Sequence, residues 1–230
     1  NALRERLHAL ADPEIAAHSQ RFFKTGPGEY GEGDRFLGIR VPSVRALAKE
    51  ARGLPLEDML PFLRSEWHKG RLLALVMLVD AYERTDPAGR EAIAQTYLAH
   101  TEHIDSWDLV DASAHTIIGP HVEVTGDLAL LDRLAASANL WERRIAIVST
   151  FHFIRRGEYA PTLLMADTLR DDPHDLIHKA VGWMLREVGK RDREVEEGFL
   201  RRHAAQMPRT MLRYAIERFP EPLRQRYLRA

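Results

Sequence analysis

Cysteine is absent from all 230 residues. Disulfides, thiolate metal sites and cysteine nucleophiles are therefore excluded, and the absence fits a reducing compartment better than a secreted, disulfide-bonded framework. The sequence also lacks any apolar run near the roughly 20 residues that a membrane-spanning helix needs. Neither end has the pattern of a signal peptide. We therefore expect a cytoplasmic protein with no membrane partner.

Motifs of common metal enzymes and hydrolases are missing as well. The 11 histidines form no His-x-x-x-His pair with a helical glutamate, and His100 and His103 have no third ligand close in the sequence. No Gly-x-Ser-x-Gly nucleophile elbow is present. The glycine-rich stretch Gly26–Gly33 is acidic and lacks the Lys-Ser/Thr of a phosphate-binding loop, so we interpret it as a mobile loop.

Charge is nearly balanced overall, with a formal net charge of −1, but it is uneven along the chain. Residues 1–139 carry 15 Lys and Arg against 21 Asp and Glu, whereas residues 140–230 carry 18 against 13. Arginine supplies 28 of the 33 basic residues, and its planar guanidinium binds phosphate oxygens in pairs. The bias fits phosphate contacts, although a GC-rich genome produces the same bias.

Apolar residues recur with a helical period through nearly the whole chain, and the stripe in 70–83 is wide enough for a buried helix. Glycine and proline separate the expected helices. Their ranges are about 14–24, 43–52, 57–66, 70–83, 87–101, 107–118, 127–137, 141–155, 160–169, 174–189, 193–204, 208–218 and 221–229. Short helices joined by short loops predict an all-α, HEAT-like α-solenoid of stacked antiparallel helix pairs, formed as a single domain over residues 1–230.

One predicted helix begins within the segment Asp105–Asp111. Ser106 is expected to be its N-cap, and Asp108 suits its first turn. Trp107 and Asp111 stand at i and i+4, so an indole and a carboxylate share one face and can act on one ligand atom. Packing of the tryptophan and pairing of the aspartate with an arginine would give the same pattern.

Two further helices carry residues that cost helix stability. Arg143 and Arg144 lie in the first turn of an apolar helix, where positive charge opposes the helix dipole. Contact with phosphate or with an acid would explain this placement, and solvated arginines are the alternative. Gly182, beside Trp183 in mid-helix, indicates that a ligand or another helix comes close to the backbone.

Four blocks in chain order resemble the AlkD-like alkylpurine DNA glycosylases, namely Phe36–Arg45, Trp107–Asp111, Trp141–Arg144 and Lys179–Glu187. The segment Met207–Glu217 resembles the last helix of that family. The likeness covers about residues 20–218, and the set of blocks is specific although each block alone is weak.

The resemblance implies a curved solenoid whose concave, basic groove holds duplex DNA and hydrolyses the N-glycosidic bond of cationic N3- and N7-alkylated purines. It implies no metal or nucleotide cofactor and no obligate protein partner. The family's catalytic aspartate falls on Asp111, and its two site aromatics fall on Trp107 and Trp183. Such an enzyme would act in base excision repair as a monomer, associated with the nucleoid in a bacterial cytoplasm.

The resemblance also gives a set of DNA-contacting arginines. The family's DNA-contacting arginine falls on Arg144. Arg40 and Arg45, which lie near the proline of the first block, are added to the predicted DNA-binding set. Arg143 and Arg186, which lie inside later blocks, complete it.

Two departures from the family affect the lesion side of the predicted site. Phe22 stands where the family has a tyrosine near DNA, which removes a hydroxyl, and the Gly26–Gly33 loop is longer than expected. Two other functions stay open. A non-catalytic protein would bind damaged or branched DNA through its arginines, with Asp111 pairing one of them. A protein-interaction scaffold, a common use of α-solenoids, would have an apolar or mixed concave face.

Overall fold

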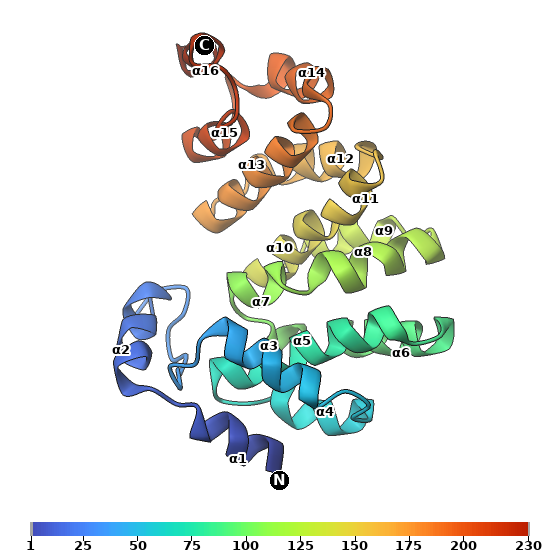
Figure 1. Ribbon diagram of the computed structural model, residues 1–230. Helices are drawn as coiled ribbons and strands as arrows, with labels where there is room; N and C mark the ends of the chain where they lie inside the picture. Colours follow the sequence, from blue (N-terminus) through green and yellow to red (C-terminus); the bar gives the residue numbers. More distant parts are fainter. Residues whose placement is uncertain (1, 230) are drawn as a thin grey trace. The chain divides into compact units, whose positions relative to one another are not determined.

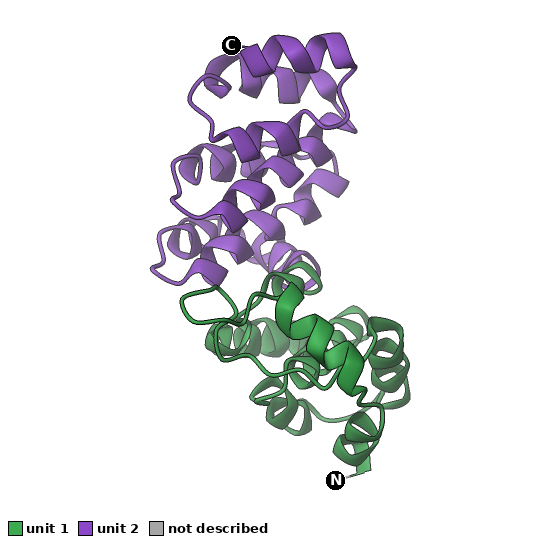
Figure 2. Ribbon diagram, turned by 90° about the vertical axis from the view of Figure 1, so that its left-hand side faces the viewer, with its two compact units in different colours: residues 1–113 green, residues 114–230 purple. Residues whose placement is uncertain are grey.

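The computed structural model describes residues 2–229, and this part of the chain is helical from end to end (Figure 1). Within it, the isolated β-bridge between Arg35 and Trp67 is the one extended pairing. The prediction of an all-α fold is confirmed. The chain divides by its internal contacts into two compact units, unit 1 (Asn1–Ser113) and unit 2 (Ala114–Ala230), which Figure 2 distinguishes. The single domain over residues 1–230 stays a prediction, as do the curvature and the groove.

Unit 1 is built around its longest helix, α5. Helix α5 packs against α3, α4, α6 and α7. Leu73, Leu75 and Leu78 on α5 are fully buried, which confirms the wide apolar stripe, and each contributes about 1.5–3 kcal/mol by leaving water. The helices of unit 1 are α1 (Ala2–Ala9), α2 (Pro13–Phe22), α3 (Val41–Glu50), α4 (Leu56–Leu63), α5 (His68–Arg84), α6 (Pro87–Leu98), the 3-10 helix η1 (Thr101–His103) and α7 (Trp107–Asp111).

Unit 2 continues the same arrangement, in which helices pack mainly on their neighbours in chain order. This pattern is that of a helical-repeat solenoid, as predicted. The helices of unit 2 are α8 (Ala114–Thr125), α9 (Ala129–Ala135), α10 (Leu140–Ser149), α11 (Phe151–Arg155), α12 (Ala160–Thr168), α13 (Asp175–Gly189), α14 (Arg193–His203), α15 (Arg209–Ala215) and α16 (Glu221–Arg229).

Gly182 marks the place where α13 meets α15. A Cβ atom on Gly182 would lie 2.5 Å from the carbonyl oxygen of Met211 and 2.5 Å from Cβ of Tyr214. Both distances are too short for non-bonded carbon and oxygen atoms, so only glycine fits here. The close approach that the sequence indicates is therefore the packing of a second helix.

Two of the predicted helices are each divided in the structure. The predicted helix 107–118 is interrupted after Asp111, where Oγ of Ser113 donates to the carbonyl oxygen of Leu109 at 2.6 Å. The predicted helix 141–155 is interrupted at Thr150, whose Oγ1 donates to the carbonyl oxygen of Ile147 at 2.7 Å. Such hydroxyl bonds to the preceding turn bend helices. Helix α1 has no counterpart among the predicted ranges.

The Gly26–Gly33 loop forms consecutive turns between α2 and α3. Its own glutamates accept backbone hydrogen bonds: Oε2 of Glu29 from the N–H of Gly26, and Oε2 of Glu32 from the N–H of Gly28, both at 2.9 Å. The acidic residues that argue against a phosphate-binding loop therefore stabilise these turns. The prediction of a mobile loop did not include this role.

None of the helices formed by residues 2–229 combines the length and the apolar character needed to cross a bilayer.

Candidate active site

Helix α7 carries two of the predicted catalytic residues at its two ends. Trp107 and Asp111 are both half-buried, while Leu109 and Val110 between them are fully buried. The indole and the carboxylate thus lie on the outward side of α7, as the i, i+4 spacing predicts. Ser106 occupies the N-cap position, but its side chain caps no backbone N–H.

The carboxylate of Asp111 lies near a buried hydroxyl pair. The phenol oxygen of Tyr97 is 2.9 Å from Oγ of Ser113. Burial raises the pKa of the Tyr97 phenol, and the charge of Asp111 raises it further. Tyr97 therefore keeps its phenol proton near neutral pH.

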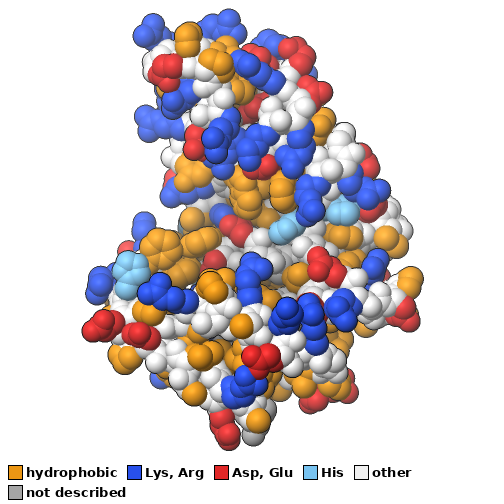
Figure 3. Space-filling view, in the orientation of Figure 1, with side chains coloured by type: hydrophobic (Ala, Val, Ile, Leu, Met, Phe, Trp, Pro, Cys, Tyr) orange, Lys and Arg blue, Asp and Glu red, His pale blue; other side chains and the backbone are white. Residues whose placement is uncertain are grey.

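An aromatic surface lies beside Trp107. The Trp107 ring stacks on Phe23, with centroids 5.5 Å apart and planes 14° apart, and the edge of Phe22 meets it at 6.1 Å. Phe22 is 56% exposed, a large fraction for a phenylalanine. Figure 3 shows this hydrophobic patch over α2. The structure thus brings Phe22 and Trp107 together on one surface of unit 1.

Beneath this surface lies a histidine that the sequence analysis missed. His68, the first residue of α5, is fully buried between the carboxylates of Asp34 and Asp108. The sequence feature that could have revealed it is the one noted for Arg143, namely basic residues in the first turn of an apolar helix. His68, Lys69 and Arg71 place three basic groups at the start of an apolar helix, where the helix dipole disfavours positive charge.

Of the two adjacent arginines on α10 in unit 2, Arg143 meets an acid. Its Nε lies 2.6 Å from Oδ2 of Asp172, and its Nη1 donates to the carbonyl oxygens of Ser137 and Ala138 at 3.1 Å. Of the explanations that the sequence left open for Arg143, the acidic partner is the one found. Arg143 ties the start of α10 to the turn before it and to the loop before α13.

Arg144 is also engaged inside unit 2. The residue is 5% exposed, and its Nη1 donates to the carbonyl oxygen of Leu176 at 2.6 Å. Leu176 lies in the first turn of α13, so Arg144 fastens α10 to the helix that carries Trp183.

Trp183 lies half-buried in the middle of α13, next to Phe151, with ring centroids 6.3 Å apart. Two guanidinium groups lie near the Phe151 ring, that of Arg191 at 5.6 Å and that of Arg155 at 5.9 Å. Arg186, which follows Trp183 on the same helix, is ion-paired with Glu217. Basic charge therefore lies close to the two rings, and Figure 3 shows Lys and Arg side chains gathered over the part of unit 2 that contains α13.

Arg40 and Arg45 in unit 1 differ from these arginines. Both are exposed on or next to α3, and neither forms an ion pair or a hydrogen bond through its side chain within residues 2–229. Their guanidinium groups are therefore available to an external anion.

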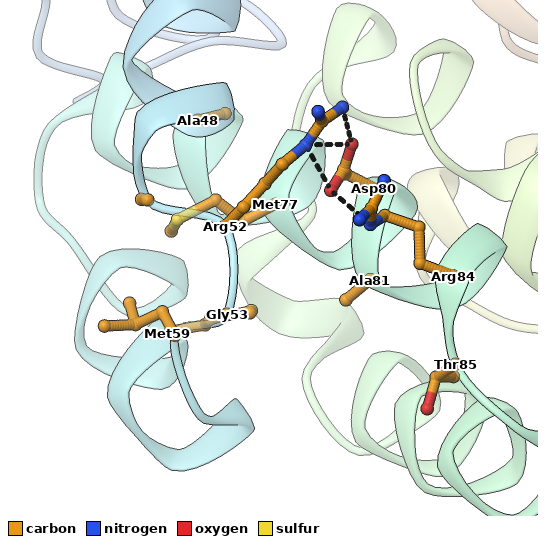
Figure 4. A pocket seen from close by; sticks show the side chains of 11 residues that line it. Ala48, Arg52, Gly53, Met59, Met77, Asp80, Ala81, Arg84 and Thr85 are labelled. Atoms are coloured by element: carbon orange, nitrogen blue, oxygen red, sulfur yellow. Dashed lines mark hydrogen bonds and ion pairs between the residues drawn. The ribbon is translucent and has the colours of Figure 1, made fainter.

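A well-formed pocket of unit 1 lies apart from the predicted residues (Figure 4). It has a volume of about 440 Å³ between α3, α4 and α5. Its charged lining residues bind one another: Nη2 of Arg52 is 2.6 Å and Nε of Arg84 is 3.9 Å from the carboxylate of Asp80. The lining of this pocket thus offers no unpaired acid or base, and α7 remains the better candidate for a reactive site.

Trp107 and Asp111 belong to unit 1, whereas Trp183 and Arg144 belong to unit 2. The assembly of these residues into one site stays a prediction. Within the described part of the chain, no group of three His, Asp or Glu side chains has the geometry of a metal site.

The comparisons with known proteins agree with the fold. Residues 3–219 match the protein family described as DNA alkylation repair enzyme. A solved structure described as a predicted DNA alkylation repair enzyme from Enterococcus faecalis is similar with a TM-score of 0.71 and 19% identity, over 92% of this chain and 97% of that chain. The protein smu.31 from Streptococcus mutans UA159 is similar with a TM-score of 0.50 and 15% identity, over 90% of this chain and 92% of that chain. At these identities the two structures show the fold alone. No curated protein sequence is significantly similar to the chain.

Proposed function

The chain belongs to the DNA alkylation repair enzyme family, and from this premise we propose that it is a DNA glycosylase. Its substrates are N3- and N7-alkylated purines in duplex DNA, and it hydrolyses their N-glycosidic bond. The observation that carries the proposal is the outward-facing pair on α7, in which the half-buried Trp107 indole and Asp111 carboxylate share one face.

The chemistry needs a group that stabilises positive charge. An alkylated purine is already cationic, so it leaves with the electron pair of the glycosidic bond and needs no proton from the enzyme. The deoxyribose then gains oxocarbenium character at C1′. A carboxylate at Asp111 and the indole faces of Trp107 and Trp183 stabilise that charge.

Water completes the reaction. Its oxygen forms a bond to C1′, and Asp111 orients it and accepts the proton that it loses. The products are the free neutral alkylpurine and an abasic site in the duplex. No step requires a metal or a redox cofactor.

DNA is held by arginines in this proposal. Arg40 and Arg45 are exposed and have no side-chain partner within residues 2–229, so they bind phosphate oxygens, and Arg144 adds a further phosphate contact. Such contacts are independent of sequence and weaken steeply as salt is added.

The test is release of 7-methylguanine from methylated duplex DNA under single-turnover conditions. We expect wild-type protein to release the base and Asp111→Asn to be slower by roughly 100- to 1000-fold. Binding to unmodified duplex should be the same for both proteins at each of several salt concentrations. Asp58→Asn, which changes an exposed aspartate in the first turn of α4, is the matched control and should release base at the wild-type rate.

Two outcomes would favour the other functions. If wild-type protein and Asp111→Asn bind DNA equally with a steep salt dependence and neither releases base, the chain is a non-catalytic binder of DNA. If neither binds DNA, the protein-interaction scaffold is the better description.

A further inference from the structure

A cluster of charged side chains lies beneath α7 in unit 1, outside the proposed chemistry. We call it the His68 cluster. Its members come from α5, from the start of α7, from the loop before α7 and from the loop between α2 and α3: Asp34, His68, Lys69, Arg71, Asp105 and Asp108.

Both nitrogens of the His68 ring face carboxylates. Nδ1 lies 2.6 Å from Oδ2 of Asp34, and Nε2 lies 2.9 Å from Oδ2 of Asp108. A carboxylate only accepts hydrogen bonds, so each ring nitrogen has to carry a proton to make its bond. The geometry therefore requires the imidazolium form of His68.

The other charged groups around His68 balance the positive charge of its imidazolium form. Arg71 binds Asp34 through Nη2 at 2.8 Å and reaches Asp105 through Nε at 3.1 Å. Nζ of Lys69 lies 3.8 Å from Oδ2 of Asp108. With His68 protonated, three cations face three carboxylates. A neutral ring would leave excess negative charge in a mostly buried cluster, which costs free energy.

The preferred ionisation of each group agrees with this count. Burial disfavours the charged ring, but hydrogen bonds and charge from Asp108 and Asp34 raise the pKa of His68 above its ordinary value. Burial likewise disfavours the ionised forms of Asp34 and Asp108. Their pKa values nevertheless lie below the ordinary value because of His68. Burial lowers the pKa of Lys69, against the charges of Asp108 and Asp34.

Two aromatic rings, those of Phe36 and Phe23, lie against His68. The Phe36 ring stacks on His68 with centroids 4.6 Å apart, and the Phe23 ring lies 4.8 Å from it. Phe23 in turn stacks on Trp107. Nζ of Lys69 lies 5.7 Å from the centre of the Phe23 ring. His68 thus touches α7 in two ways, through Asp108 and through the Phe23–Trp107 stack.

Helix α7 depends on such contacts because it spans only Trp107–Asp111. Five residues are too few to hold a helix by backbone hydrogen bonds alone. Its orientation, and with it the direction of the Asp111 carboxylate, is set by tertiary contacts. Among these contacts, the Asp108 carboxylate is paired with His68 and lies near Lys69.

We propose that His68 is a positioning residue for α7: as an imidazolium clamped between Asp34 and Asp108 it sets the direction of Trp107 and Asp111, and loss of its proton to solvent releases that hold. The proposal rests on the proposed function in taking Trp107 and Asp111 as the catalytic pair. It adds that base release has an alkaline limit set by a histidine that does not touch DNA.

The first measurement is the protonation of the ring itself. In protein labelled with ¹⁵N-histidine, the His68 signals at pH 7 should be those of a ring with both nitrogens protonated. They are assigned by their absence from His68→Gln. A singly protonated His68 ring at pH 7 would overturn the proposal, whether or not the protein releases base.

The second measurement is the pH profile of single-turnover base release. The rate of base release by wild-type protein should fall at alkaline pH, and the midpoint of this fall, the alkaline limb, should equal the midpoint of the His68 titration. His68→Gln should be slower by roughly 10- to 100-fold at pH 7, as expected for a displaced catalytic group, and should lack that alkaline limb. Its affinity for duplex DNA should equal that of the wild type. An unchanged rate and limb in His68→Gln would overturn the proposal.

His152→Gln is the matched control because His152 also pairs with a carboxylate, that of Glu123 at 2.9 Å, but in unit 2. It should keep the wild-type rate and limb. Asp108→Asn serves as second variant should His68→Gln fail to fold. It keeps the shape of the side chain but removes one of the two charges that hold the proton, so the limb should move to lower pH. A limb that does not move contradicts the proposal.

The proposed function and the positioning role can fail separately. If wild-type protein releases no base, the proposed function is wrong, and Trp107 fluorescence still tests the positioning role. The difference between the wild type and Trp107→Phe isolates Trp107 from the other tryptophans. The Trp107 fluorescence should change with pH at the midpoint of the His68 titration. Fluorescence that stays constant through this titration would refute the positioning role.

Discussion

The two units hold their predicted site residues through different basic groups, a histidine in unit 1 and arginines in unit 2. In unit 1, α7 is held by charged side chains, with His68 between Asp34 and Asp108. In unit 2, α10 is held to the start of α13 by Arg144, which donates to a backbone carbonyl. A histidine–carboxylate contact titrates in the range where proteins work, whereas arginine keeps its charge throughout. If His68 positions α7 as proposed, α7 should respond to pH, whereas the contact of Arg144 with α13 should not.

The comparison also separates arginines that look alike in the sequence. Arg143 and Arg144 are largely buried and engaged, while Arg40 and Arg45 are exposed and have no side-chain partner among residues 2–229. Buried arginines contribute first to stability, and exposed arginines contribute first to binding. Single substitutions in each unit test this division.

The largest effect is expected from Arg144→Ala. The change removes the hydrogen bond from Arg144 to the carbonyl oxygen of Leu176 and a buried side chain, so we expect a loss of about 2–4 kcal/mol in the free energy of unfolding. Urea denaturation followed by circular dichroism measures it. Arg45→Ala, at an exposed position, is the control and should stay within about 0.5 kcal/mol of the wild type. If Arg144→Ala is as stable as the wild type and loses DNA binding instead, Arg144 belongs with the exposed arginines.

Gly182→Ala tests whether unit 2 relies on close backbone contact. A Cβ atom would lie 2.5 Å from the carbonyl oxygen of Met211, so α13 and α15 have to separate, and we expect a loss of about 1–3 kcal/mol. Gly198→Ala on α14 is the matched control. Its Cβ would meet only the tip of Arg201 at 3.7 Å, so the gain in helix propensity should stabilise the protein by up to about 1 kcal/mol. Equal effects of the two substitutions would show that α13 and α15 are not tightly packed.

The helices were largely predictable from the sequence, because apolar period and helix breakers are local signals. The interruptions after Asp111 and at Thr150 were missed because apolar period and helix breakers do not mark them; each is accompanied by a hydroxyl bond to the preceding turn. The His68 cluster could not be predicted from local signals, since Asp34 and Asp108 lie 34 and 40 positions from His68. Only the basic residues at the start of α5 pointed to a buried acidic partner.

Glu196→Gln tests whether unit 2 is free of pH-sensitive groups. Burial, with a further contribution from Glu197, raises the pKa of Glu196 from 4.5 to about 9. Between these values the folded state binds a proton that the unfolded state lacks, so stability falls as pH rises through this window. Glu196→Gln should remove this fall and stabilise the protein by about 1–2 kcal/mol at pH 8, with little change at pH 4.

The control for Glu196→Gln is Glu194→Gln on the same helix, where the carboxylate is exposed and paired with Arg201. It should leave the pH dependence of the unfolding free energy as in the wild type. Parallel curves for Glu196→Gln and the wild type would mean that Glu196 is ionised in the folded protein. Any strong pH dependence of the unfolding free energy would then be expected from unit 1 and not from Glu196. The two units would in that case differ more in their response to pH.

The smallest effects are expected from Arg40→Ala and Arg45→Ala, measured as DNA affinity. Each removes one exposed guanidinium and no internal contact, so the unfolding free energy should stay within about 0.5 kcal/mol of the wild type. Removal of one phosphate contact should reduce the slope of log affinity against log salt by about 0.9, whatever the DNA sequence. Arg52→Ala, which removes an arginine already bound to Asp80, is the control and should leave the slope unchanged. A reduced slope for Arg52→Ala, with none for Arg40→Ala or Arg45→Ala, would mean that an arginine's intramolecular partner does not decide whether it binds DNA, and the division between engaged and available arginines would fail.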